Sequence, residues 1–337
     1  MDNRIENIRL TAVEIATIWM QYQNDSMASC VLRYFSAKAE DDSIKEIIDS
    51  ALTMSQNSLR LIANTFCDEG FAVPQGFGKD DVNVNSPRLF GDIFVLDYLK
   101  HMARLGLLSS GIGLSLVVRS DLRQFYQSHL SLTATLDSMV THLMLSKGIY
   151  VRSPYIPPTK EVHFAQTQEF LGGLFEGERP LSALEITHLF TNIQTNLIGK
   201  ALIIGFSQVA QSSQVRDYFL RGKEIAAKHN DLFSNRLSQE DLPSQATLDA
   251  LVTDSIVPPF SDKLMMFHVT ALIAAGIANY GTAISVSQRY DLGAQYTRLA
   301  AEIALYAEDG ANILIENGWL EELPQAVNRR ELAMATT

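Results

Sequence analysis

Apolar residues recur at spacings of three and four along most of this chain, which is the period of an amphipathic α-helix. One clear run is Leu189, Ile193, Leu197 and Ala201. Long alternating runs rich in β-branched residues are absent, so the sequence offers little from which to build a sheet. The pattern predicts an all-α protein with long helices over 10–38, 42–68, 88–117, 121–147, 181–209, 212–239, 260–287 and 291–317.

The same pattern occurs twice along the chain. The segment LTAVEI at 10–15 recurs as LSALEI at 181–186, a shift of 171 positions (181 − 10). Later, RSDL at 119–122 recurs as RYDL at 289–292, a shift of 170 (289 − 119). A repeat of about 150 residues is far longer than the units of solenoid proteins, so the chain is a duplicated domain and not a stacked array.

Two of the predicted helices begin with the same capping signal. Thr11 is followed three residues later by Glu14, and Ser182 is followed in the same way by Glu185. In such a capping box the hydroxyl and the carboxylate each satisfy a free amide at the start of the helix. The sequence therefore explains both glutamates as structural residues of the two first helices.

One connection in each copy is much longer than the others. The first two helices of a copy, and the last two, are joined by about three residues, which forces antiparallel neighbours. The middle connections, 69–88 and 240–259, are long and rich in Pro, Gly, Asp and Asn. Near the end of the first, Ser86-Pro87 predicts an N-cap followed by proline at the first helical position. A four-helix bundle with one long crossover has ferritin-like topology.

The predicted fold is therefore two tandem ferritin-like four-helix bundles that arose by internal duplication. We expect the first bundle over 1–150, a linker over 151–180, the second bundle over 181–324 and a tail over 325–337. With 337 residues in total, each copy is long enough to bury its own core. The tail is expected to be frayed, as chain ends commonly are.

Two further segments have unusual composition. The linker contains prolines, which indicate extended chain, and Phe164, Phe170 and Phe175, which predict that it docks on an apolar surface. In the second copy, 197–206 is apolar on nearly all sides, unlike the matching 26–35. A helix without a polar face is buried on several sides, so we expect this one to be a seam between the two bundles or between two chains.

The bulk composition excludes several classes of protein. The net charge of −11 and the lack of a basic stripe argue against nucleic acid, and leave protein partners or self-association. The most apolar stretches, 106–118 and 197–206, are shorter than the roughly 20 residues of a transmembrane helix. No secretory signal is visible at the N-terminus, so we expect a cytoplasmic protein. Cys30 and Cys67 lack metal-like spacing and are expected to be small buried groups.

Several motifs resemble one bacterial family. They are DDVN at 80–83, PRLF at 87–90, RSDLR at 119–123, GKALIIGFSQV at 199–209 and FSDKLMMFH at 260–268. They are similar to the domain of unknown function 3231, found in spore-forming bacilli and often labelled as similar to spore coat protein F. The resemblance spans nearly the whole chain and implies a ferritin-like double bundle with a possible spore association. It implies no reaction, because the family has no established biochemical activity.

A ferritin-like bundle raises the question of a buried metal site. Di-iron bundles use one Glu from each of two helices and a Glu-x-x-His motif from each of the other two. This chain has one such motif, from Glu185 to His188. The short turn between the first two helices of the second copy puts Asn192 level with His229. If the crossover is ferritin-like, Glu302 falls near the same layer, with His268 one or two turns away. The candidate ligands for a single iron, manganese or zinc ion are therefore His229, Glu302, Glu185 and His268.

The first copy is poorer in ligands, because Ser58, Tyr98 and Leu132 occupy the positions of His229, His268 and Glu302. Competing interpretations of the candidates are also available. Capping explains Glu185, and hydrogen-bonded interior positions explain the histidines. No Gly-x-Ser-x-Gly elbow or phosphate-binding loop occurs, so the sequence does not favour an enzyme. The glycines within the third helices, around 111–113 and 276–281, allow close helix approach or leave a pocket.

Three hypotheses follow. The chain is a non-enzymatic structural or interaction protein whose bundles bind a partner or each other. Alternatively, it is a ferritin-like protein with one metal site in the second bundle, at His229 and Glu302. The third hypothesis is a binder of a small apolar ligand, beside the glycines of the third helices. The lack of a complete catalytic set leads us to prefer the first.

Overall fold

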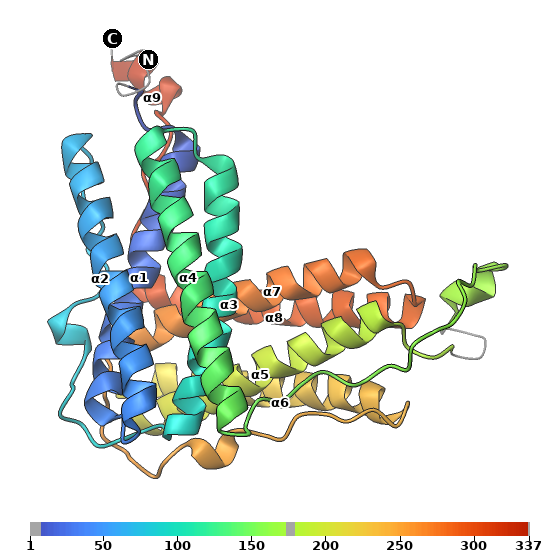
Figure 1. The fold of residues 1–337 in the computed structure, drawn as a ribbon. Coiled ribbons are helices and arrows are strands. Elements are labelled where there is room, and N and C mark those ends of the chain that lie inside the picture. The colour runs from blue at the N-terminus through green and yellow to red at the C-terminus, as the bar shows by residue number, and fades with distance from the viewer. Residues whose placement is uncertain (1–7, 173–178, 336–337) are drawn as a thin grey trace.

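The computed structural model describes residues 8–172 and 179–335, and every regular element in these ranges is helical (Figure 1). This confirms the all-α prediction. The first four long helices are α1 Ala12–Lys38, α2 Asp42–Asp68, α3 Asp92–Leu116 and α4 Ser120–Ser146. The second four are α5 Ala183–Val209, α6 Ser213–Ser238, α7 Asp262–Val286 and α8 Tyr290–Glu316. Short helices are η1 Lys79–Asp81, η2 Gln168–Leu171, η3 Asp249–Leu251 and α9 Arg329–Ala335.

Hydrogen bonds between helix ends define the connectivity of the first bundle. Asp92, at the start of α3, accepts from the backbone N–H of Asp41, just before α2, at 2.9 Å. Glu14, at the start of α1, accepts from the backbone N–H groups of Val118 and Arg119, between α3 and α4. The end of α2 and the start of α3 are thus at opposite ends of the bundle. The connection between them crosses its whole length, which the length of the connection permitted but did not establish.

The second bundle repeats this arrangement. Asp262, at the start of α7, accepts from the backbone N–H of Ser212 at 2.8 Å. Glu185, at the start of α5, accepts from the backbone N–H of Arg289 at 3.0 Å. Each bond has its counterpart in the first bundle at the same repeat position. The duplication seen in the sequence is therefore a duplication of structure as well.

The two crossover connections pair with each other, which corrects one prediction. The third helix does not begin at Pro87: its N-cap is Gly91, and the residues before it are extended. Gly91 donates its N–H to Leu251 O at 2.8 Å, and Thr253 donates to Leu89 O at 2.9 Å. The Ser86-Pro87 signal failed because backbone groups after it find partners in the other crossover, which a local capping pattern does not reveal.

The bundles cross one another and share a core. In Figure 1 the first bundle stands upright, and α5 to α8 lie across its base. Phe206 of α5 is buried and packs against Phe90 of the first crossover, with ring centroids 6.3 Å apart. Gly205 permits this approach, because a Cβ there would lie 2.6 Å from the Phe90 ring. The segment 197–206 is thus a seam between the two bundles.

The linker differs from expectation. Phe164 is 77% exposed, so it is not docked on an apolar surface. Phe170 is 36% exposed, and the guanidinium of Arg179 lies 4.3 Å from its ring centroid. Phe175 falls outside the described residues. The prediction of docking was wrong for Phe164, which is exposed in the extended part of the linker.

The segment directly after α8 is bound to the first bundle, and the expectation for the tail over 325–337 stays a prediction. After α8 the chain runs along the first bundle, and Glu321 accepts from the backbone N–H groups of Gln75 and Gly76, at 2.9 and 2.8 Å. It ends in the short helix α9, near the start of α1 in Figure 1. Of the two cysteines, Cys30 is buried as expected and Cys67 is exposed. The predicted limits of the two domains stay predictions.

Candidate functional site

The structure brings together two of the four predicted metal ligands. His229 Nε2 lies 3.2 Å from Glu302 Oε2, and His229 Nδ1 lies 2.9 Å from the Tyr280 hydroxyl. Lys228 pairs with the same carboxylate, at 2.7 Å. Burial lowers the pKa of His229, although the neighbouring Glu302 opposes this. The carboxylate of Glu302 is therefore already matched by an ammonium group, and the buried imidazole is already hydrogen-bonded through both nitrogens.

Glu185 has a different environment, at the start of α5. It accepts from the backbone N–H of Ser182 at 2.8 Å and from the guanidinium of Arg179 at 2.9 Å. Burial raises the pKa of this carboxyl, but the hydrogen bonds from Arg179 and Ser182 outweigh it and bring the pKa to about 2. The capping interpretation of Glu185 is confirmed, with an arginine added that the capping pattern did not predict.

His268 also lies apart from the His229–Glu302 pair. Its Nε2 is 3.1 Å from the Tyr98 hydroxyl of the first bundle, across the interface between the bundles. Within residues 8–172 and 179–335, no three His, Cys, Asp or Glu side chains are grouped closely enough to hold a metal ion. Asn192 of α5 donates to His188 O in its own helix. Metal binding at these residues stays a prediction.

A cavity of about 540 Å³ lies in the first bundle. All four helices of that bundle line it, and α7 of the second bundle forms a further wall. Its lining is mostly apolar and includes Met27, Leu32, Ala51, Met54, Leu99, Met102, Ala103, Leu136, Ala271 and Leu272. Gly106 of α3 also lines it, whereas Gly111 and Gly113, the glycines singled out in the sequence, are not among its lining residues. Gly113 instead allows close approach, because a Cβ there would lie 2.6 Å from the Tyr126 ring.

The cavity opens to the surface between α1, α3 and α7. Met20, Leu108 and Ile112 line this opening and are 46%, 54% and 60% exposed. Such exposure of large apolar side chains around a concave site is typical of ligand-binding clefts. A small molecule therefore has a route into the bundle between the two halves of the chain.

A buried carboxylate lies in the cavity wall. Asp25 of α1 accepts a hydrogen bond from Gln21 Nε2 at 2.8 Å and another from the Ser58 hydroxyl. Burial raises the pKa of Asp25 to about 6, although hydrogen bonds from Ser58, Gln21 and Ser55 act in the opposite direction. At neutral pH the carboxylate is therefore mostly ionised in an apolar surrounding, an unusual state for a core residue.

A histidine extends this polar cluster across the bundle. His129 Nδ1 lies 2.8 Å from the Ser110 hydroxyl, and its Nε2 lies 3.4 Å from Gln21 Nε2. Burial lowers the pKa of His129, so it is neutral at pH 7. With Nδ1 donating to Ser110, Nε2 is free to accept from Gln21, which also donates to Asp25. The cluster is a chain of neutral donors that ends at one charged acceptor.

His268 contributes a second polar group to the wall. Burial lowers its pKa to about 3, so the ring is neutral. If the Tyr98 hydroxyl donates to Nε2, the ring hydrogen is on Nδ1, and this nitrogen has no partner in the described part of the chain. Buried donors are nearly always paired with protein, water or ligand. In that tautomer His268, which lines the cavity, has a ring N–H without a hydrogen-bond partner among the described residues.

The second bundle has a counterpart of this cavity, but it is about 70 Å³. Each residue that lines it matches a first-bundle position after the shift of 171 or 170. Larger side chains account for the lost volume: Tyr280 replaces Ser110, Ile303 replaces Thr133, Tyr306 replaces Leu136 and Ile273 replaces Ala103. The two bundles thus offer the same internal site, open in the first and filled in the second.

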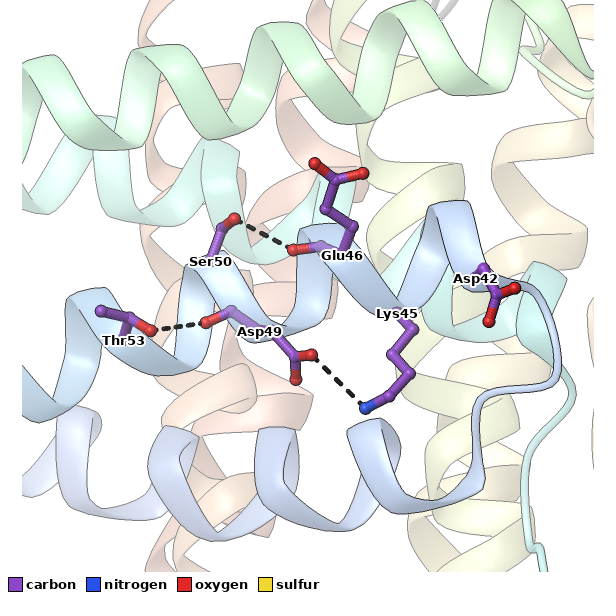
Figure 2. A pocket seen from close by; sticks show the side chains of 6 residues that line it. All are labelled: Asp42, Lys45, Glu46, Asp49, Ser50 and Thr53. Atoms are coloured by element: carbon purple, nitrogen blue, oxygen red, sulfur yellow. Dashed lines mark hydrogen bonds and ion pairs between the residues drawn. The ribbon is translucent and has the colours of Figure 1, made fainter.

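A different hollow lies on the outer surface of α2 (Figure 2). Its lining side chains all come from this one helix: Asp42, Lys45, Glu46, Asp49, Ser50 and Thr53. Lys45 pairs with Asp49 at 3.4 Å, and the two hydroxyls bond to carbonyls of their own helix. It is a solvated face of a single helix, so we do not regard it as a site.

Family comparison agrees with the duplication. A model for a family described as Protein of unknown function (DUF3231) matches residues 2–162 and again 169–332. The chain belongs to this family. The resemblance noted in the sequence is confirmed, including the tandem copy. The two matches show that each bundle is one family unit.

Other comparisons add little. A crystal structure from Bacillus halodurans, described as a "putative spore coat protein", aligns with a TM-score of 0.41 and 16% identity. The alignment covers 46% of this chain and 100% of that protein. Curated proteins provide no significant match. The family is established, and its biochemical role has to come from the site itself.

One helix beside the cavity has membrane-like composition. By length and hydropathy α7 could cross a bilayer, and 22% of its most apolar stretch is buried. A single such helix is weak support for a membrane protein. In this structure α7 forms one wall of the cavity, and this accounts for part of its apolar surface.

Sequence reasoning missed Asp25, Gln21 and His129. Each lies on a helix face that packs inward, and none belongs to a recognised motif. A signal was nevertheless present in the repeat: Ser110 and Thr133 stand where the second copy has Tyr280 and Ile303. At these two positions the first copy has the smaller side chain, which favours a space in that copy.

Proposed function

We propose that this protein binds a small, largely apolar molecule in the cavity of the first bundle. The observation that carries the proposal is the 540 Å³ space, with an apolar lining and a small number of buried polar groups. Ligand sites in proteins have this size and this composition. The buried charge of Asp25 and the unpaired nitrogen of His268 further support it, because perturbed groups gather at functional sites.

The contrast with the second bundle strengthens the proposal. A packed interior is the ordinary outcome of folding, since voids weaken the core. The second bundle attains such packing with the same backbone plan. The space in the first bundle is therefore a property of its side chains, and a binding role gives a reason for keeping it.

The alternative hypotheses receive less support. A metal at His229 and Glu302 would have to displace Lys228 from the carboxylate, and Glu185 is held by Arg179. A structural or interaction role, a ferritin-like relationship and a cytoplasmic or spore-associated location stay predictions. An interaction role is compatible with ligand binding, because the exposed Leu108 and Ile112 lie at the cavity opening.

Calorimetric titration with decan-1-ol tests the proposal. Wild-type protein should bind the alcohol with a stoichiometry near one. The double variant Ala103→Ile/Thr133→Ile, which copies the second-bundle residues, should bind at least tenfold more weakly because the cavity is filled. Ile303→Val, in the second bundle, is the control and should bind as the wild type does. No binding by the wild type, or equal binding by the filled variant, would reject the proposal.

A further inference from the structure

We propose that the ligand is an organic cation: an apolar body with an ammonium group that pairs with Asp25. This inference rests on the proposed ligand-binding function and specifies the chemistry of the ligand. It starts from the position of the carboxylate, which lines the cavity and is only 5% exposed.

No protein cation neutralises Asp25 among the residues that the structure describes. Its hydrogen-bond donors are Gln21 on its own helix and Ser58 on α2, both neutral. The titratable groups that face it from α4 are His129, whose pKa is lowered by burial, and Tyr126, whose pKa is raised by burial and by the charge of Asp25. Neither supplies a positive charge at neutral pH.

A buried carboxylate without a counter-charge is costly in free energy. The neutral hydrogen bonds reduce that cost but do not remove the charge. A ligand cation in contact with Asp25 would do so, and the attraction is strong in a water-poor site. An anionic ligand such as a fatty acid would instead bring two negative charges together. A neutral ligand would leave the carboxylate as it is.

The repeat offers an internal comparison. The position that matches Asp25 is Asn196, which donates to the Tyr280 hydroxyl at 3.0 Å in the filled core of the second bundle. The negative charge thus occurs in the copy that has the space and not in the copy that lacks it. If the only role of Asp25 were to hold the helices in place, an asparagine such as Asn196 would be sufficient in both bundles.

The test compares three probes with equal chains: decylamine, decan-1-ol and decanoate, titrated at pH 7.5. The amine should bind wild-type protein at least tenfold more tightly than the alcohol, and decanoate should bind most weakly. In Asp25→Asn, which copies Asn196, the amine should lose this advantage while the affinity for the alcohol changes less than threefold. Retained alcohol binding shows that the variant is folded with its cavity intact.

A pH series separates charge from shape. Decylamine stays protonated between pH 7.5 and pH 5, whereas Asp25, with a pKa near 6, becomes neutral. The affinity of wild-type protein for the amine should fall about tenfold over this range, and that for the alcohol should not change. An alcohol that binds as tightly as the amine, or an amine preference that survives Asp25→Asn, overturns the inference. If none of the three probes binds, the proposed function itself is wrong.

Discussion

The two bundles share their helix order, their crossover and their capping carboxylates, yet their interiors differ. In the second, two tyrosines meet at the centre: the rings of Tyr218 and Tyr306 are stacked with centroids 4.2 Å apart, and each hydroxyl donates to the other's backbone carbonyl. Gly222 and Gly310 make room for them, because a Cβ at either would lie within 2.3 Å of a tyrosine hydroxyl. The first bundle has smaller side chains and a cavity at this level.

The volume of the internal site therefore depends on side-chain size, because the arrangement of the helices is the same in both bundles. The helices of the first bundle do not collapse onto the space, because both ends of the bundle are held by bonds such as those of Glu14 and Asp92. Duplication gives one copy that can remain tightly packed while the other acquires a ligand site. Substitutions in both bundles test this difference between them.

Removing the tyrosine pair should weaken the second bundle most. Tyr306→Leu copies Leu136 of the first bundle, deletes a ring and a buried hydrogen bond, and leaves a cavity. We expect a loss of about 3–4 kcal/mol in the free energy of unfolding, measured in urea. Leu305→Ala is the control, because Leu305 is exposed and its truncation should cost less than about 0.5 kcal/mol. Equal effects of the two variants would contradict a packed second core.

The two capping glutamates should contribute unequally to the free energy of unfolding. Glu185 pairs with Arg179, whereas the first copy has Ile8 at the matching position. The carboxyl pKa of Glu185 falls from 4.5 to about 2 on folding, so its stabilisation is present above about pH 4.5 and disappears as pH falls towards 2. Glu185→Gln should cost about 3 kcal/mol at pH 7. Glu14→Gln should lower the free energy of unfolding by less. Denaturation of both variants at several pH values is the measurement, and equal losses at pH 7 would contradict this prediction.

Asp25 should show the opposite dependence on pH. Its pKa rises from 3.8 to about 6 on folding, so the protonated carboxyl stabilises the protein below about pH 4, and this stability is lost as pH rises through 6. Between pH 4 and pH 7 the free energy of unfolding of the wild type should fall by about 2–3 kcal/mol relative to that of Asp25→Asn. Urea titrations of both proteins at these pH values provide the measurement. Parallel pH profiles would mean that Asp25 is solvated or paired.

The smallest expected effect comes from partial filling of the cavity. Thr133→Ile copies Ile303 and adds apolar volume beside Gly106. The space there is already narrow, because a Cβ added to Gly106 would lie 3.0 Å from Thr133 Cγ2. We expect the free energy of unfolding to rise by up to about 1 kcal/mol. Thermal unfolding without ligand is the measurement. A loss of more than about 1 kcal/mol would indicate that the site is too tight for the added atoms.

Much of the architecture could be predicted because its signals are local and repeated. Apolar spacing gave all eight long helices to within a few residues, and the capping boxes at Glu14 and Glu185 matched the structure. The start of α3 was wrong because Leu89 and its neighbours bond to the distant crossover at Thr253. Pairing between segments so far apart in the chain leaves no local pattern to detect.

The candidate site was harder to predict. His229 and Glu302 lie 3.2 Å apart, as expected for a bundle with the crossover topology that the prediction assumed. His268 could not be placed, because its contact with Tyr98 depends on how the two bundles cross. The cavity arises from the combined size of many side chains, so no single residue in the sequence predicts it. Comparing the two copies position by position is the way in which the sequence alone would have revealed it.

The most direct test of the central contrast is a crystal structure of the protein soaked in decan-1-ol. We predict electron density for the alcohol inside the first bundle, between Thr133 and Asp25, and none at the matching position between Ile303 and Asn196. Density in the second bundle, or only on the outer surface with an empty first bundle, would contradict the account.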